Sequence, residues 1–196
     1  MKKPVSFAVI AAAVAAFFAQ SANAERNRDA SRFLEIGPSL LYHQSKGESA
    51  SQYGAEVTAS YYFMESDTSA LRLSSAIGFY SGEIVNSYYN RDRYADTFKG
   101  TSTTVLVALE YEIENNNMRF RAGPMLGLMG VNWEGKYYKS ETMTGSSPAY
   151  GLQASVTFDL ESGRYVTLQY KYLDFSDVVL KENTAHAATI SLGFSF

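Results

Sequence analysis

Apolar and polar residues alternate one by one through most of the chain beyond residue 31, and this pattern limits the possible folds. In residues 50–63, for example, Tyr53, Val57 and Tyr61 alternate with polar residues such as Gln52 and Glu56. Successive side chains point to opposite faces only in an extended strand. The pattern recurs at residues 32–44, 50–63, 70–82, 98–113, 118–133, 148–160, 165–175 and 185–196. The sequence therefore predicts an all-β fold of eight strands.

The polar face of these strands carries charges of both signs, interleaved with glycine and serine. Its charged residues are Glu35, Glu56, Arg72, Glu110, Glu112, Arg119, Arg121, Asp159 and Lys171. A soluble sandwich or a lipocalin also alternates, but it turns its polar face to water. Small residues beside nearly balanced charges favour the narrow interior of a barrel, where the charges pair away from lipid. We therefore expect these residues to form a charge network inside the barrel.

The connections between the expected strands differ in length. Those at 64–69, 114–117 and 161–164 are short, whereas those at 83–97, 134–147 and 176–184 are longer and richer in charge or tyrosine. The first connection, 45–49, is also short. Short turns at one end and long loops at the other are typical of outer-membrane barrels. Aromatic residues near the strand ends fit the interfacial girdles of such barrels, namely Tyr42, Tyr53, Tyr61, Phe63, Phe79, Tyr111, Phe120, Tyr150 and Phe158.

The stretch 185–196 keeps its alternation up to the aromatic Phe196. A bare terminal strand with an apolar face would invite aggregation in water. Pairing with the first strand would close a barrel and remove the free edge, and contact with lipid would cover the apolar face. The sequence therefore predicts an eight-stranded antiparallel transmembrane β-barrel.

The N-terminal residues have the order of a secretory signal peptide. A basic start with Lys2 and Lys3 precedes an apolar run at 5–19 and the small-x-small site Ala22-Asn23-Ala24. A membrane anchor is the alternative, but the run is shorter than the roughly 20 apolar residues of a spanning helix. We expect residues 1–24 to be a signal peptide and residues 25–196 to be the barrel domain.

Composition excludes several classes of function. Removing Lys2 and Lys3 from the 17 Lys and Arg leaves 15 against 20 Asp and Glu, so the mature chain has a formal charge of −5. This charge argues against a general nucleic-acid binder. The absence of cysteine excludes disulfides and cysteine-based metal sites. With two histidines in the sequence, we expect no metal site and no cofactor.

The closing third of the chain has four local motifs, namely the AYG opening at 149–151, Tyr170-Lys171-Tyr172, Asp177-Val178 and the final Gly-x-x-Phe. In these motifs it resembles the Ail/Lom/OmpX family of enterobacterial eight-stranded outer-membrane proteins. The stretch "RAGPMLGLMGV" at 121–131 is similar to that family's glycine-rich fifth strand. The resemblance implies a surface-exposed barrel. In some members the loops mediate adhesion to host cells or matrix and resistance to complement, and in others the role is in envelope physiology. The family has no conserved catalytic residues, so the resemblance implies that this chain is not an enzyme.

Catalytic candidates in the sequence are few. His43-Gln44-Ser45 has the His-x-Ser spacing of lipid A deacylase barrels, in which an imidazole activates a hydroxyl. No third residue that would orient the histidine is identifiable, so we expect no catalysis here. His186 falls on the lipid-facing parity near the outer end of the last strand, which favours an interfacial histidine.

The interior charges either line a channel or fill the barrel. Eight strands enclose a space about wide enough for side chains to fill. We therefore expect a filled, non-conducting lumen.

Two of the expected loops combine tyrosine with basic residues. These residues are Tyr88, Tyr89, Arg91, Arg93 and Tyr94 in the second loop and Lys136, Tyr137, Tyr138 and Lys139 in the third. Tyrosine offers contact area with a polar tip, and arginine or lysine engages sulfates, phosphates or carboxylates. The alternative is that these residues hold lipopolysaccharide or continue the strands above the membrane.

Three functions remain open from the sequence. The first is a surface protein that binds host extracellular matrix, glycans or complement regulators through its loops. The second is a structural or lipopolysaccharide-interacting envelope protein without a protein ligand, and the third is an enzyme that modifies lipid A. In each case the expected partners include outer-membrane lipid, lipopolysaccharide and the barrel-assembly machinery, and we expect a monomer that binds no nucleic acid.

The signal-peptide interpretation makes a direct prediction. The mature protein should begin at Glu25, immediately after the Ala22-Asn23-Ala24 site, and should fractionate with the outer membrane. N-terminal sequencing and membrane fractionation test both points. A mature protein that is soluble in the periplasm would contradict the prediction.

Overall fold

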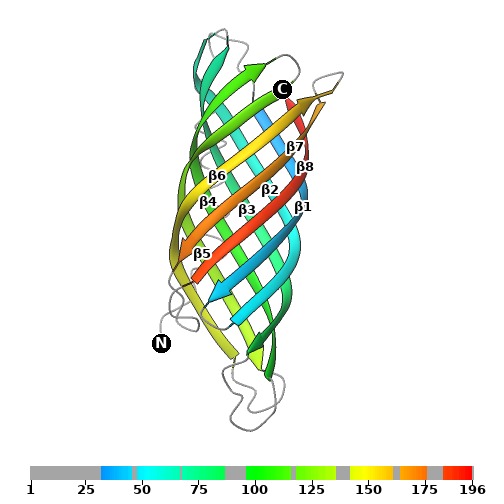
Figure 1. Ribbon diagram of the computed structural model, residues 1–196, viewed down its shortest axis with the longest axis vertical. Helices are drawn as coiled ribbons and strands as arrows, with labels where there is room; N and C mark the ends of the chain where they lie inside the picture. Colours follow the sequence, from blue (N-terminus) through cyan, green and yellow to red (C-terminus); the bar gives the residue numbers. More distant parts are fainter. Residues whose placement is uncertain are drawn as a thin grey trace.

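The computed structural model describes residues 32–45, 48–66, 68–86, 96–115, 118–135, 142–160, 164–175 and 183–195. These residues form strands β1 (Arg32–Ser45), β2 (Glu48–Glu65), β3 (Ser69–Asn86), β4 (Asp96–Asn115), β5 (Met118–Gly135), β6 (Thr142–Asp159), β7 (Arg164–Phe175) and β8 (Asn183–Ser195). Figure 1 shows these strands wound as one tilted barrel. Among the described residues, no helix has the length and hydropathy needed to cross a bilayer.

The strands close into a barrel in the order β1-β2-β3-β4-β5-β6-β7-β8. Each strand pairs antiparallel with its neighbour in sequence, and β1 pairs with β8 from Phe33↔Ser195 to Gln44↔Thr184. Closure gives the last strand a partner on both sides, so neither β1 nor β8 is left as an open edge of the sheet. The predicted all-β, eight-stranded antiparallel barrel is confirmed.

The two ends of the barrel differ in their connections. The end where β1 begins and β8 ends has the short connections 66–68, 116–117 and 160–163, and we call it the turn end. Backbone hydrogen bonds close these turns, with Ser66 N donating to Ser69 O at 2.8 Å and Leu160 N to Arg164 O at 2.7 Å. The opposite end has the connections 46–47, 87–95, 136–141 and 176–182, and we call it the loop end.

Strands β3 to β6 are longer toward the loop end than the alternation predicts. The sequence placed 83–97 and 134–147 in loops, but β3 and β4 pair as far as Asn86↔Asp96, and β5 and β6 as far as Glu134↔Thr142. An antiparallel ladder needs only paired backbone groups, so it continues where apolar and polar side chains no longer alternate regularly. The expected loops are therefore shorter than predicted.

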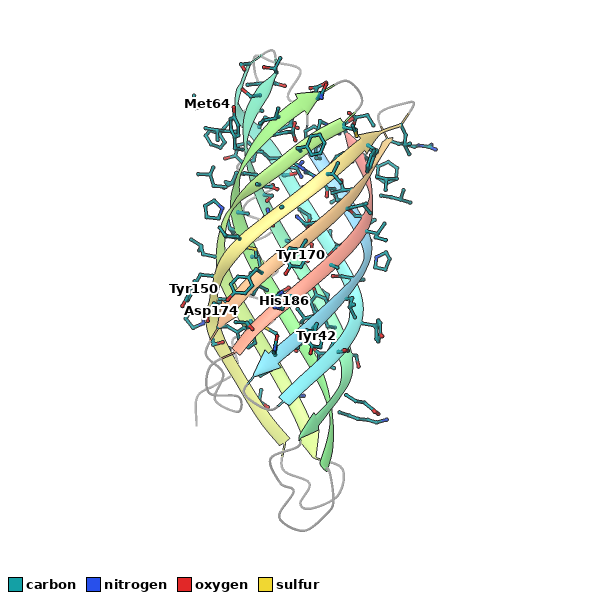
Figure 2. All side chains as sticks on the ribbon, viewed as in Figure 1. Tyr42, Met64, Tyr150, Tyr170, Asp174 and His186 are labelled. Carbon is teal, nitrogen blue, oxygen red and sulfur yellow. The ribbon has the colours of Figure 1, made fainter. Side chains whose placement is uncertain are left out.

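The outer wall of the barrel is apolar, as the alternation predicts. Its exposed large hydrophobic residues include Ile36, Leu40, Val57, Phe79, Val107, Leu109, Tyr111, Ile113, Phe120, Leu126, Leu128, Leu152, Leu168, Ile190, Leu192 and Phe194. On β4 the band runs from Val105 to Ile113, close to the roughly 9 to 11 residues that cross a bilayer. Figure 2 shows these side chains projecting outward around the barrel. A lipid bilayer is the environment in which such a band is stable.

A β-bulge explains why the alternation breaks near the end of β2. The register shifts between Tyr62, which pairs with Arg72, and Met64, which pairs with Leu71. The extra residue, Phe63, and its neighbour Met64 are therefore both exposed. As a result β2 continues to Glu65, two residues beyond the predicted end at residue 63.

Gly193 on β8 makes room for an aromatic ring in the lumen. A Cβ atom added to Gly193 would lie 2.0 Å from the Cε2 atom of Tyr165. Tyr165 is itself 1% exposed, so its ring has little space to move. A glycine is thus needed here for close approach.

We predict that Gly193→Ala destabilises the barrel by about 1 to 3 kcal/mol, because the added methyl group overpacks the lumen against Tyr165. Urea unfolding in lipid vesicles measures the change. Gly130→Ala is the matched control, since a Cβ atom there would meet no atom closer than 3.9 Å. Equal stability of the two variants would contradict this role for Gly193.

Candidate functional site: the charged lumen and the loop end

The nine charged residues that the sequence assigned to the barrel interior come from β1 to β7. All of them except Asp159 are buried in the structure. Asp159 lies at the turn end, where it pairs with the guanidinium of Arg119. The structure thus brings these residues together along the lumen.

Glu35 is the centre of the charge network. Its Oε1 atom accepts hydrogen bonds from Arg72 Nη2 at 2.8 Å and from Arg121 Nη1 at 3.0 Å. The hydroxyl of Ser191 donates to Oε2 at 3.4 Å. One carboxylate of β1 therefore connects β3, β5 and β8 across the lumen.

The two arginines also contact carboxylates of β4. Arg72 Nε lies 3.5 Å from Glu110 Oε2, and Arg121 Nε lies 3.9 Å from Glu112 Oε2. Buried charges are stable only when they are paired. Four strands of the barrel are therefore linked through Glu35 and its two arginines.

Hydroxyl groups also contact Arg121. Its Nη2 atom donates to Thr157 Oγ1 at 2.6 Å and to Thr167 Oγ1 at 3.1 Å. Thr157 and Thr167 face each other on β6 and β7, with their hydroxyl oxygens 2.8 Å apart. The network thus extends to the opposite side of the barrel.

Aromatic rings surround the charges at the turn end. The Cζ atom of Arg119 lies 5.0 Å from the ring centroid of Tyr165 and 5.4 Å from that of Phe33. Phe33 also makes an edge contact with Tyr62 at 5.0 Å between centroids, and the Tyr62 hydroxyl donates to Glu112. These contacts fill the turn end of the lumen with side chains.

A second ion pair lies closer to the loop end. Lys171 on β7 pairs with Glu56 on β2, and both side chains are 1% exposed. The Tyr80 hydroxyl donates to Glu56 Oε2 at 3.2 Å. This pair marks the boundary between the charged part of the lumen and an apolar part.

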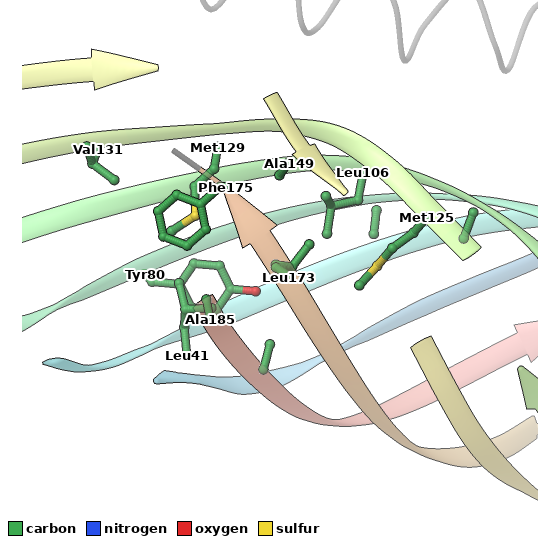
Figure 3. Packing of buried hydrophobic residues seen from close by; sticks show 13 residues of the cluster. Leu41, Tyr80, Leu106, Met125, Met129, Val131, Ala149, Leu173, Phe175 and Ala185 are labelled. Atoms are coloured by element: carbon green, nitrogen blue, oxygen red, sulfur yellow. The ribbon is translucent and has the colours of Figure 1, made fainter. Parts of the chain in front are cut away.

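The loop-end part of the lumen is filled by an apolar cluster that the sequence reasoning missed. Figure 3 shows Tyr80, Met129 and Phe175 packed together, with Leu41 and Leu173 nearby. These residues share the inward parity with the charged residues. Two adjacent apolar residues place one apolar side chain on each face of a strand. Pairs such as Leu40-Leu41 and Met125-Leu126 therefore indicate apolar side chains in the lumen.

His43 lies near the loop-end terminus of β1, and its side chain faces the lumen. Its ring is 2% exposed, and its Nε2 atom lies 3.0 Å from Gln52 Oε1. The side chain of Ser45, its proposed partner, lies outside the described residues. Within the part of the chain that the structure describes, no three His, Asp or Glu side chains are grouped to hold a metal ion. That the chain is not an enzyme stays a prediction.

The nine residues assigned to ligand binding cannot be placed in the same way. Tyr88, Tyr89, Arg91, Arg93 and Tyr94 fall in 87–95, and Lys136, Tyr137, Tyr138 and Lys139 fall in 136–141, and both segments lie outside the described residues. The structure does describe the strands that these segments connect, and the ends of those strands lie at the loop end.

Comparison with known proteins agrees with this architecture. A family model described as outer membrane protein beta-barrel domain matches residues 9–196. The chain belongs to this family. No curated protein matches the sequence. Membership places the protein in the bacterial outer membrane.

Solved structures show the same fold at low sequence identity. Neisserial surface protein A is 12% identical, with a TM-score of 0.59 over 84% of this chain and 97% of that one. Ail of Yersinia pestis, in complex with the heparin analogue sucrose octasulfate, is 14% identical, with a TM-score of 0.56 over 86% and 100%. A major outer membrane protein from Thermus thermophilus is 7% identical, with a TM-score of 0.51 over 84% and 99%. The resemblance to barrels of the Ail type is thereby confirmed.

We predict that Glu35→Gln destabilises the barrel by about 3 to 5 kcal/mol, because it leaves Arg72 and Arg121 buried without their shared carboxylate. The control is Glu83→Gln, since Glu83 pairs with Lys99 at 3.4 Å on the exposed surface. Loss of an exposed pair costs only about 0 to 1 kcal/mol. Urea unfolding in vesicles compares the two variants, and similar stabilities would show that the network does not hold the barrel together.

Proposed function

We propose that this protein binds anionic host ligands at the bacterial surface through the connections β3–β4 and β5–β6. The ligand class is a sulfated glycan or an acidic patch of a host protein, and the biological role is adhesion or resistance to complement. The observation that carries the proposal is the extension of β3 to β6 beyond the lipid-facing band at the loop end.

The extension differs from the band in its outward-facing residues. Within the band these residues are apolar, as at Ile77 on β3 and Val105 on β4. Farther toward the loop end they become polar, as in the ion pair of Glu83 with Lys99, whose side chains are 56% and 62% exposed. Charged pairs on the outer wall are costly in hydrocarbon, so this part of the wall belongs above the bilayer.

The same change occurs on the next pair of strands. Thr144 Oγ1 on β6 donates to Asn132 Oδ1 on β5 at 3.3 Å, and both residues are exposed. Figure 1 shows the four strands reaching farther than β1, β7 and β8 at the lower end of the view. The two connections that they carry therefore start and end well clear of the lipid band.

The composition of these two connections suits an anionic ligand. Arg91, Arg93, Lys136 and Lys139 supply positive charge, and five tyrosines supply contact area with hydroxyl groups: Tyr88, Tyr89, Tyr94, Tyr137 and Tyr138. Exposed basic residues steer an anionic partner, and tyrosines are common in the energetically important centre of interfaces. The two residue types therefore have separable roles.

Ail supports the choice of the first probe. Its solved structure contains the heparin analogue sucrose octasulfate, which is a small, densely sulfated molecule. The similarity of the two chains is one of fold, so the glycan is tested here as a ligand class and not inherited from Ail.

The test measures binding of heparin and of sucrose octasulfate to the mature protein in lipid nanodiscs. The variant R91Q/R93Q/K136Q/K139Q should bind at least tenfold more weakly at low salt, with slower association and a flatter dependence on ionic strength. K99Q is the control, since Lys99 is an exposed basic residue of the strands outside the two connections. Replacing Tyr88, Tyr89, Tyr137 and Tyr138 with alanine should mainly speed dissociation.

All variants should keep the heat-modifiable gel migration of a folded barrel. The recognition proposal is wrong if both connection variants bind like the parent protein and if cells that express them survive in serum as well as cells that express the parent. The structural or lipopolysaccharide-interacting function would then be the better account.

A further inference from the structure

The outer wall of the barrel has an open apolar hollow of about 670 Å³ that crosses β2, β1, β8, β7 and β6. Its lining includes the small residues Pro38 on β1, Ala188 on β8 and Ala154 on β6, together with the larger Leu168 and Ile190. Tyr170 on β7 also lines the hollow and pairs with both Ala154 and Ala188. These residues belong to the outward-facing parity of their strands. The hollow therefore opens toward lipid and not into the lumen.

The hollow lies beside the junction of β1 and β8 near Pro38. The pairs Ile36↔Leu192 and Ser39↔Thr189 are in the same register, so the sheet continues across this stretch. The two backbones stay close, since a Cβ atom added to Gly37 would lie 1.9 Å from Ile190 O. Proline has no N–H group to donate to a ladder, so Pro38 interrupts only the hydrogen bonding at this point.

Polar and aromatic residues form a rim at the loop-end side of the hollow, consisting of Tyr42, Tyr170, Tyr172 and His186. The Tyr170 hydroxyl lies 2.5 Å from His186 Nδ1, and the Tyr172 ring makes an edge contact with the imidazole at 5.5 Å between centroids. Tyr42 on β1 is the register partner of His186 on β8 in the antiparallel ladder. Figure 2 shows Tyr42, Tyr170 and His186 close together on neighbouring strands.

The hollow is apolar and the rim is polar, so together they match a lipid that has an apolar chain and a polar headgroup. A histidine on the lipid-facing wall is costly in hydrocarbon but not at the interface, where it can meet a headgroup. Imidazole and phenol groups both donate hydrogen bonds to phosphate oxygens. From His186 to Ile190 the strand extends roughly 13 Å, and at a tilt of roughly 40° this spans about 10 Å of the roughly 30 Å hydrocarbon core. A lipid with its headgroup at the rim therefore places an acyl chain along the hollow.

We propose that the hollow and its rim bind one molecule of lipid A, the membrane anchor of lipopolysaccharide. One acyl chain lies in the hollow against Ala188 and Ala154, and a glucosamine phosphate contacts Tyr170 and His186. The long connections of an outer-membrane barrel face outward, so the rim lies in the outer leaflet, where lipopolysaccharide is the abundant lipid. This site is separate from the proposed ligand surface on the β3–β4 and β5–β6 connections.

The experiment is native mass spectrometry of the mature protein in mild detergent, titrated with bisphosphorylated lipid A. The parent protein should retain one lipid A molecule. Ala188→Leu should weaken retention at least tenfold because the larger side chain fills the hollow, and Ala154→Leu should do the same. Ala122→Leu is the matched control, since Ala122 is an exposed alanine of the outer wall that does not line the hollow.

The rim is tested with the double variant Y170F/H186A. It should weaken retention of bisphosphorylated lipid A at least fivefold and leave retention of dephosphorylated lipid A unchanged. Tyr111→Phe is the control, because Tyr111 is an exposed lipid-facing tyrosine of β4 far from the rim. Heat-modifiable migration verifies that each variant is folded.

Three results would overturn the proposal. The first is equal retention by Ala188→Leu, Ala154→Leu and Ala122→Leu. The second is equal competition by phosphatidylglycerol, which would assign the site to phospholipid in general. The third is a dimer of the parent protein that Ala188→Leu dissociates, which would show that a second copy of the chain occupies the hollow.

Discussion

The contact of Glu35 with two arginines is the interaction on which the rest of the structure depends. One carboxylate, 2% exposed, accepts hydrogen bonds from both Arg72 and Arg121. A closed barrel in lipid must keep its charges inside and paired, because neither lipid nor bulk water is available to solvate them there. The network therefore allows an outer wall that is almost wholly apolar in the bilayer.

The lumen is divided along its length. Charged and aromatic side chains fill the turn end around Arg119 and Glu35, and apolar side chains such as Leu41 and Phe175 fill the part toward the loop end. With its lumen filled in this way, the barrel acts as a rigid support. The two surfaces that we propose to be functional are the extension of β3 to β6 beyond the lipid-facing band and the hollow on the lipid-facing wall.

The sequence predicted the fold well because period-two alternation reports which face each residue occupies. It placed Glu56 and Lys171 on the inner face, and the structure pairs them although they are 115 residues apart. It could not show that Leu41 and Phe175 belong to one buried cluster in the lumen, because alternation does not specify depth or cross-barrel contacts. The strand ends were also underestimated, since the ladder from Glu83↔Lys99 to Asn86↔Asp96 continues without an apolar pattern.

The central claim is that the lumen is filled along its length, and planar-bilayer recording of the purified mature protein tests it most directly. The account predicts no steady open-channel current, because the ion pairs around Glu35 and the apolar cluster around Phe175 each obstruct the path of an ion. Large, steady and reproducible open-channel currents from folded protein would contradict it.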